Sequence, residues 1–140
     1  VEAATVGDVQ QAGVFGGVYY TDPTTSKPTW KAYYPASTAA ADIVATIYMD
    51  PDIVFEAQHD ETGTAALNFA SGNFVGTGGS TTTGQSTQEL DTSSFGTTAS
   101  GLKQIGISKD PDNSDTSSAN CNAYAVFGTG ENVFTFATGI

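Results

Sequence analysis

Short apolar runs rich in Val, Ile, Tyr and Phe alternate along the chain with clusters of Gly, Pro, Asp and Ser, about one run every ten residues. This spacing is typical of an antiparallel all-β domain, in which each run forms one strand and each polar cluster a turn. The pattern predicts a single β domain over residues 1–140, folded as a small antiparallel barrel or sandwich of about eight strands with long Gly/Ser/Thr-rich loops.

The first two predicted strands form a hairpin with a long tip. Residues 14–20 and 29–34 are aromatic and β-branched, and the turn-rich residues 21–28 join them. Gly16 and Gly17 interrupt the first strand, which indicates a bulge or a close backbone contact. Alternation along the second strand places three side chains on one face: Trp30, Ala32 and Tyr34.

A second pair of strands is predicted around an Asp-Pro-Asp turn. Residues 42–49 and 53–59 have strand composition, and the turn at residues 50–52 predicts that they are adjacent and antiparallel. Residues 35–41 have room for one helical turn capped by Ser37, which is too short to be stable alone. Residues 64–75 are ambiguous, and the remaining strands are expected at 102–109, 120–127 and 133–138.

The longest polar stretch covers residues 76–101, where 19 of 26 residues are Gly, Ser or Thr. Such a composition buries too little apolar surface to order itself. Leu90 and Phe95 interrupt it, and we expect them to pin the stretch to the domain as an ordered arm. A hydroxyl-rich arm of this kind is expected to lie against a protein surface.

The charge balance excludes some classes of partner. The chain has 15 acidic residues, four lysines and no arginine, with a formal net charge of −11. A nucleic-acid binder neutralises phosphates with Lys and Arg, and an anionic membrane attracts the same residues, so neither partner is expected. No apolar run approaches the roughly 20 residues needed to span a bilayer. No cofactor is indicated.

The residues that carry nucleophilic catalysis are scarce, so no enzyme is predicted. His59 is the single histidine, at a predicted strand end that we expect to be exposed, and no Gly-x-Ser-x-Gly elbow accompanies it. Cys121 is the single cysteine, which excludes an intrachain disulfide and, with one histidine, a zinc site. It is expected to be a small buried residue on a strand.

One acidic cluster invites comparison with calcium loops. Asp110, Asp112 and Asp115 place carboxylates at alternate positions, which suits a hard cation. An EF-hand loop needs Gly at the position of Asp115 and Glu at the position of Cys121, so that pattern fails. These three residues stay weak metal candidates, beside a similar pair at 50 and 52, and capping of turn amides is the favoured role for such carboxylates.

Four segments together resemble a known family. They are Gly-Val-Phe-Gly-Gly-Val-Tyr-Tyr-Thr-Asp-Pro at 13–23, Tyr-Pro-Ala-Ser at 34–37, Tyr-Met-Asp-Pro-Asp-Ile-Val-Phe-Glu at 48–56 and Ser-Thr-Thr-Thr-Gly-Gln-Ser-Thr-Gln-Glu-Leu-Asp at 80–91. In this order they are similar to head decoration, or cement, proteins of tailed bacteriophages, which are encoded near the major capsid protein. The resemblance covers most of the chain.

The resemblance implies a structural β protein on the outer surface of a phage head. Its expected partner is the major capsid protein, often with three copies at local threefold positions, and its location is the virion after synthesis in the bacterial cytoplasm. Residues 1–12 would be the end of a longer N-terminal segment. It implies no catalytic residue. The residues expected at the interface lie in the arm and the hairpin: Thr81, Thr82, Gln85, Leu90, Phe95, Lys27 and Trp30.

Two other functions stay open. A secreted or cell-surface carbohydrate-binding module would stack sugars on the early aromatic cluster, with or without calcium. That cluster comprises Tyr19, Tyr20, Trp30, Tyr33 and Tyr34. A self-assembling filament subunit is the third interpretation.

Overall fold

The computed structural model describes residues 13–76, 79–80, 83–98 and 100–128, and over these residues the chain is all-β. Nine strands are found there, joined into open sheets in which every strand pair is antiparallel, together with two short 3-10 turns. None of the described helices is long and apolar enough to cross a membrane. The predicted fold class is confirmed. The strand expected at 133–138 and the segment 1–12 lie outside the described residues.

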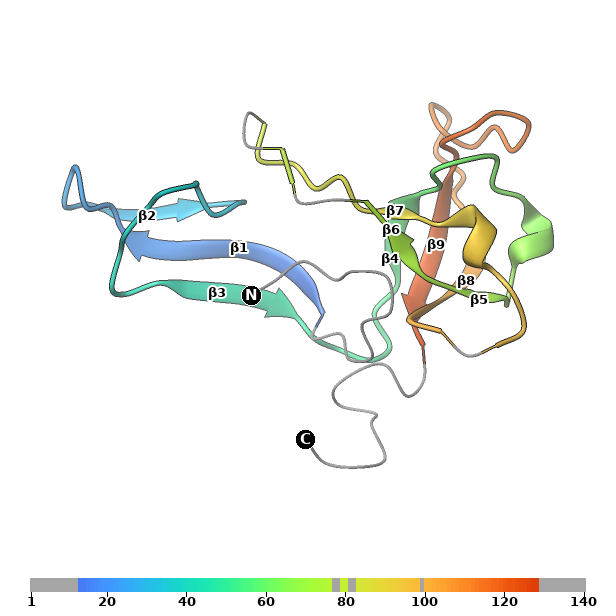
Figure 1. Ribbon diagram of the computed structural model, residues 1–140, viewed down its shortest axis with the longest axis horizontal. Helices are drawn as coiled ribbons and strands as arrows, with labels where there is room; N and C mark the ends of the chain where they lie inside the picture. Colours follow the sequence, from blue (N-terminus) through green and yellow to red (C-terminus); the bar gives the residue numbers. More distant parts are fainter. Residues whose placement is uncertain (1–12, 77–78, 81–82, 99, 129–140) are drawn as a thin grey trace.

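Residues 13–50 form a three-stranded sheet, called here the projecting sheet because it extends to one side of the molecule (Figure 1). Its central strand β1 (Val14–Thr21) pairs with β2 (Pro28–Lys31) on one side and with β3 (Val44–Tyr48) on the other. The predicted hairpin and the bulge are both confirmed, since the β1–β3 register shifts between Phe15 and Gly17. The second predicted strand is shorter than expected, because it ends at Lys31.

Residues 51–128, called here the body, contain the other sheets. Strands β4 (Phe55–Gln58), β9 (Asn122–Phe127), β8 (Leu102–Ile107) and β5 (Ser71–Gly72) form one sheet in that order. A small second sheet pairs β6 (Phe74–Val75) with β7 (Glu89–Leu90), and the 3-10 turns are η1 (Ala65–Leu67) and η2 (Thr92–Ser94).

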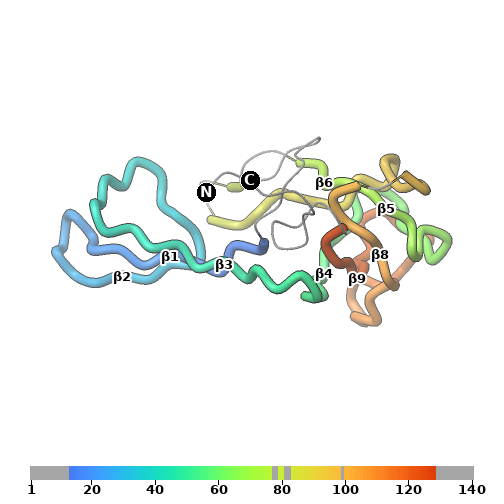
Figure 2. Tube along the Cα trace, turned by 90° about the horizontal axis from the view of Figure 1, so that it is seen from below, coloured from blue at the N-terminus to red at the C-terminus, as the bar shows by residue number. Residues whose placement is uncertain are grey.

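The core lies in the body, between its four-stranded sheet and the residues around β7. Leu90, Leu102, Ala123 and Ala125 are fully buried there, and Phe95 is one of the half-buried rings packed against them. Residues 76–101 were expected to be pinned to the domain by Leu90 and Phe95, and both pins are confirmed. The arm itself points from the body toward the projecting sheet in both ribbon views (Figures 1 and 2).

The predicted pairing of residues 42–49 with 53–59 is wrong. β3 pairs with β1 in the projecting sheet, whereas β4 pairs with β9 in the body. The Asp50 turn forms as expected, with its carboxylate accepting from the Asp52 N–H at 2.9 Å and its carbonyl from Ile53. The turn redirects the chain from one sheet to the other, because nothing in a tight turn requires the flanking strands to pair.

Of the remaining local expectations, the one for His59 fails. Residues 35–41 form no helix but an irregular connection, in agreement with their low capacity to hold a helical turn alone. His59 is fully buried rather than exposed. Cys121 is buried and free, as predicted.

Candidate functional site: the exposed face of the projecting sheet

One face of the projecting sheet presents large apolar side chains to solvent. The strand register aligns Tyr19 of β1 with Trp30 of β2 and Val44 of β3, so these three form a row across the sheet. Tyr48 and Val14 pair at the other end of β3 and lie on the same face. The exposed fraction lies between 50 and 62% for Tyr19, Trp30, Val44 and Tyr48, and it is 37% for Val14. We call these five residues the aromatic face.

The glycines of β1 hold two of these rings against the backbone. A Cβ added at Gly17, where φ is +124°, would lie 2.8 Å from the indole of Trp30. A Cβ at Gly16 would lie 2.7 Å from the ring of Tyr48. Both rings therefore lie directly on the glycine backbone. Any other residue at position 16 or 17 would displace the ring by its Cβ. The Tyr19 and Trp30 ring centroids are 6.4 Å apart.

The opposite face of the same sheet is partly covered by other segments of the chain. Val18 and Tyr20 are buried, and the ring of Tyr34 packs edge-on against Tyr20 with centroids 6.1 Å apart. The arm reaches this side at Gly84, where φ is +72° and an added Cβ would lie 2.2 Å from the ring of Tyr33. A groove of about 1070 Å³ remains between arm and sheet. Phe15, Tyr34 and Ile43 line this groove and stay 37–44% exposed, whereas Tyr19, Trp30, Val44 and Tyr48 of the aromatic face are 50–62% exposed.

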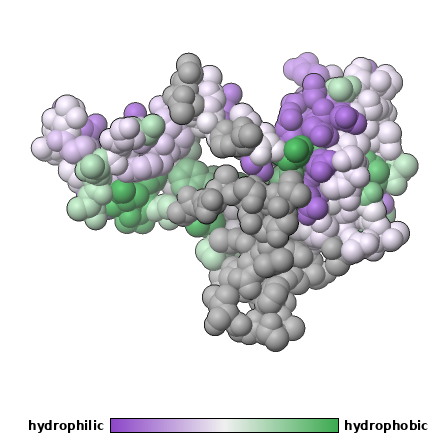
Figure 3. Space-filling view, in the orientation of Figure 1, coloured by the Kyte–Doolittle hydropathy of each residue, from purple (hydrophilic) through white to green (hydrophobic). Residues whose placement is uncertain are grey.

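Charge is distributed unevenly between the two parts of the chain. Residues 13–50 contain two lysines and three aspartates, for a net charge of −1, whereas residues 51–128 contain two lysines and nine carboxylates, for a net charge of −7. Among the described residues, eight of the ten exposed large hydrophobic ones fall between positions 14 and 48. Figure 3 shows apolar residues gathered over the projecting sheet and strongly hydrophilic ones over the body. The apolar surface and the acidic surface are thus on different parts of the molecule.

Both ring nitrogens of the buried His59 are hydrogen-bonded within the body. Its Nε2–H donates to Gln104 Oε1 at 2.9 Å, because the Gln104 amide nitrogen is already donating to the Thr64 carbonyl and Asn68 Oδ1. Its Nδ1 then accepts from the Thr92 hydroxyl at 3.1 Å. Burial lowers the pKa of His59, opposed in part by the Gln104 hydrogen bond and the charge of Asp60. The neutral ring thus links Thr92 of η2 to Gln104 of β8.

The acidic candidates for a metal site cap backbone amides instead. Asp110 accepts from the Asp112 N–H at 3.0 Å. Asp115 accepts from the Ser117 N–H and from the hydroxyls of Ser117 and Ser118, and these bonds lower its pKa. Among the described residues no group of three or more His, Cys, Asp or Glu side chains is placed to hold a metal ion. The expected capping role of turn carboxylates is confirmed at these positions.

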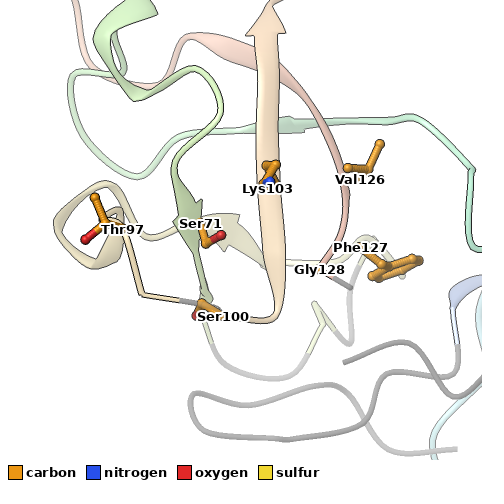
Figure 4. A pocket seen from close by; sticks show the side chains of 7 residues that line it. All are labelled: Ser71, Thr97, Ser100, Lys103, Val126, Phe127 and Gly128. Carbon is orange, nitrogen blue, oxygen red and sulfur yellow. The ribbon is translucent and has the colours of Figure 1, made fainter. Parts of the chain in front are cut away.

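A smaller hollow of about 340 Å³ lies at the ends of β5, β8 and β9 (Figure 4). Its polar groups are the Lys103 ammonium and the hydroxyls of Ser71, Thr97 and Ser100. No imidazole or carboxylate is among its lining residues in the described part of the chain.

The predicted interface residues fall into three groups. Trp30 belongs to the aromatic face, while Lys27 and Gln85 are exposed at the hairpin tip and in the arm. Leu90 is fully buried and Phe95 is half-buried against Gly72 and His59, so their side chains support the core and offer little to a partner, which corrects that expectation. Thr81 and Thr82 lie outside the described residues.

Three residues of the aromatic face were missed by sequence reasoning: Val14, Val44 and Tyr48. The signal was present, because alternation along residues 42–49 places Val44 and Tyr48 on one side of a strand. What the pattern lacked was the information that this side faces solvent.

Comparison with known proteins gives no match, whether to a family model, to a curated protein or to a solved structure.

Proposed function

We propose that this protein is a non-enzymatic attachment protein, which decorates the outer surface of a phage head by docking its aromatic face on the major capsid protein. The observation that carries the proposal is the exposed apolar face of the projecting sheet. Contiguous apolar surface of this kind marks protein interaction sites. A three-stranded sheet with little core of its own also gains stability when a partner covers it.

The size of the aromatic face supports weak attachment at each site. Tyr19, Trp30 and Tyr48 are about half exposed. Buried aromatic side chains account for roughly 150–250 Å² each, so about 300 Å² of ring surface is available for docking. At about 25 cal/mol per Å² this is about 7 kcal/mol before the cost of association, which is of similar size. One docked molecule is therefore held weakly, and bridging neighbouring subunits or trimerisation raises the overall affinity.

The charge distribution supports an orientation on the shell. The body carries most of the negative charge, and the projecting sheet is close to neutral. Docking through the sheet directs the acidic body outward, away from the packaged nucleic acid. A ligand that binds only the assembled shell stabilises that state by mass action, by about 2.7 kcal/mol at a hundredfold excess over its Kd.

Cosedimentation with intact capsids tests the proposal. The capsids are assembled from a tailed-phage major capsid protein, the partner that the family resemblance implies. Trp30→Ala removes the largest ring of the aromatic face, and we expect it to lower retention about tenfold or more, as for an aromatic hot spot. The matched control is Phe69→Ala, because Phe69 is 73% exposed on the body. Equal retention of both variants and the unaltered protein would refute docking through the aromatic face.

Carbohydrate binding is the second candidate, favoured by the same exposed rings of Trp30 and Tyr48 lying on glycine backbone. Flat apolar ring faces suit the faces of sugar rings. A glycan array with and without chelator separates the two functions. Binding of a defined glycan that is lost in Trp30→Ala, without binding to capsids, would establish the sugar-binding function in place of the decoration function.

A further inference from the structure

The two edges of the projecting sheet differ in how they resist pairing with another chain. β2 is four residues long, begins with Pro28, contains Lys31 and follows directly after Lys27. Short length, proline and lysine are the devices by which edge strands avoid accepting a further strand. The β2 edge is therefore protected.

β3 forms the other edge and, although it has only five residues, it contains neither proline nor lysine. It pairs with β1 on one side and, over the part of the chain that the structure describes, with no strand on its other side. Residues 43–49 contain no charged residue, no glycine and no proline, and most of them are β-branched or aromatic. An uncharged edge of this composition is a ready template for another strand.

Two carboxylates bracket this open edge. Asp42 precedes β3 and accepts hydrogen bonds from the backbone N–H of Thr21, at 3.0 and 3.1 Å, and from its hydroxyl at 2.6 Å. These bonds lower the pKa of Asp42 and keep it charged. Asp50 follows β3 and is fixed by the hydrogen bond from the Asp52 N–H. Asp42 and Asp50 thus place one carboxylate just before and one just after β3 in the sequence, and the Asp42 carboxylate is held toward β1 by Thr21.

This arrangement disfavours a second copy of the chain as the occupant. Antiparallel pairing of two β3 strands centred on Thr46 would place Asp42 of each copy opposite Asp50 of the other. Like charges directly opposite each other destabilise a strand pair, and each copy also carries a net charge of −11. A segment flanked by basic residues has the complementary charge.

We propose that β3 accepts an extended segment of a partner protein as a fourth strand of the projecting sheet, with about five residues of alternating apolar character flanked by Lys or Arg. The five residues of β3 span roughly 16 Å, which sets the length of the paired segment. In strand addition, main-chain hydrogen bonds between β3 and the partner segment supply affinity. Side chains of the partner segment that lie beside Val44 and Tyr48 extend the aromatic face and supply specificity. The inference rests on the proposed attachment role and names how the partner is held.

The test measures amide hydrogen exchange in the full chain by NMR, with the peptide Lys-Lys-Val-Thr-Val-Thr-Val-Lys-Lys as the probe. Strand addition protects only the β3 amides that point away from β1, which are every second residue. We expect exchange at those amides to slow about tenfold or more. The peptide Glu-Glu-Val-Thr-Val-Thr-Val-Glu-Glu has the same central strand and is expected to give no protection.

Thr46→Lys places a charge at the centre of the edge, on an exposed side chain, and is expected to abolish the protection. Thr25→Lys is the matched control, because it makes the same charge change at the exposed hairpin tip, where only the backbone of Thr25 is hydrogen-bonded to Asp22.

Equal protection by both peptides, uniform protection along β3, or full protection in Thr46→Lys would overturn the proposal. So would alternate protection that grows with protein concentration in the absence of peptide, because the occupant would then be a second copy. If the edge proposal fails while Trp30→Ala still releases the protein from capsids, the attachment function stands and only its strand-addition mode is wrong.

Discussion

Truncation of Leu90 tests whether the Gly/Ser/Thr-rich stretch is an integral part of the body. Leu90 is fully buried, pairs with Phe74 across β6 and β7, and lies in the core cluster with Leu102, Ala123 and Ala125. Its backbone also bonds the body, since the Leu90 carbonyl accepts from the Asp60 N–H at 3.1 Å. Leu90→Ala removes three buried carbons and leaves a cavity.

The expected cost follows from this burial. Buried Leu→Ala substitutions lower the free energy of unfolding by about 2–5 kcal/mol, and a fully buried side chain in a small core belongs near 3 kcal/mol. For a domain of this size the melting temperature falls by about 3 °C per kcal/mol, hence by roughly 10 °C. Urea denaturation monitored by Trp30 fluorescence and by circular dichroism measures the loss.

Leu67→Ala is the matched control. Leu67 lies in η1 and is only half-buried, so the same truncation is expected to cost about 1 kcal/mol or less. If Leu90→Ala were as mild as Leu67→Ala, the stretch would behave as a detached loop and the account of an arm pinned to the body would be refuted.

Three further predictions address the buried histidine, the arm and the acidic turns. Because burial lowers the pKa of His59 below its ordinary 6.5, the unfolded chain takes up a proton first as the pH falls. Stability contributed by the neutral ring is therefore complete above about pH 6.5 and declines below it, with a slope of up to about 1.4 kcal/mol per pH unit. Urea melts between pH 7.5 and 5 measure the slope; His59→Gln is expected to lack it, and an equal slope in both proteins would contradict this assignment. Gly84→Ala places a Cβ in the space occupied by the ring of Tyr33, at a residue whose φ is positive. We expect amide exchange at residues 83–86 to become faster, while the free energy of unfolding falls by only about 1 kcal/mol. Unchanged exchange would show that the arm does not pack on Tyr33. Finally, EDTA or millimolar calcium should leave the melting temperature unchanged, because Asp110 and Asp115 already cap turn amides; a calcium-dependent rise would contradict that role.

Local features of the fold were predictable because they depend on neighbouring residues. The bulge follows from Gly16 and Gly17, and the Asp50 turn follows from the ability of its carboxylate to cap a nearby amide. The pairing partner of each strand was harder to predict from the sequence. The turn after β3 fixes only the local chain direction, so the separation of β3 and β4 into different sheets depends on pairing with β1 and with the distant β9.

Long-range contacts also explain the error at His59. Its partners Thr92 and Gln104 lie 33 and 45 residues away in sequence, and no local pattern signals them. The aromatic face was half predictable. The alternation of Trp30 and of residues 42–49 was visible, but which side faces solvent depends on residues 32–43 and the arm covering the other side.

Oxidative footprinting of the capsid-bound protein distinguishes docking through the aromatic face from docking through the body. Hydroxyl radicals label exposed rings, and mass spectrometry quantifies labelling at Trp30, Tyr48 and Phe69 in the free and bound protein. Docking through the aromatic face predicts that labelling of Trp30 and Tyr48 falls several-fold on binding, while Phe69 on the body keeps its labelling. Protection of Phe69 with unchanged labelling of Trp30 and Tyr48 would show that the protein attaches through its body and would contradict the account.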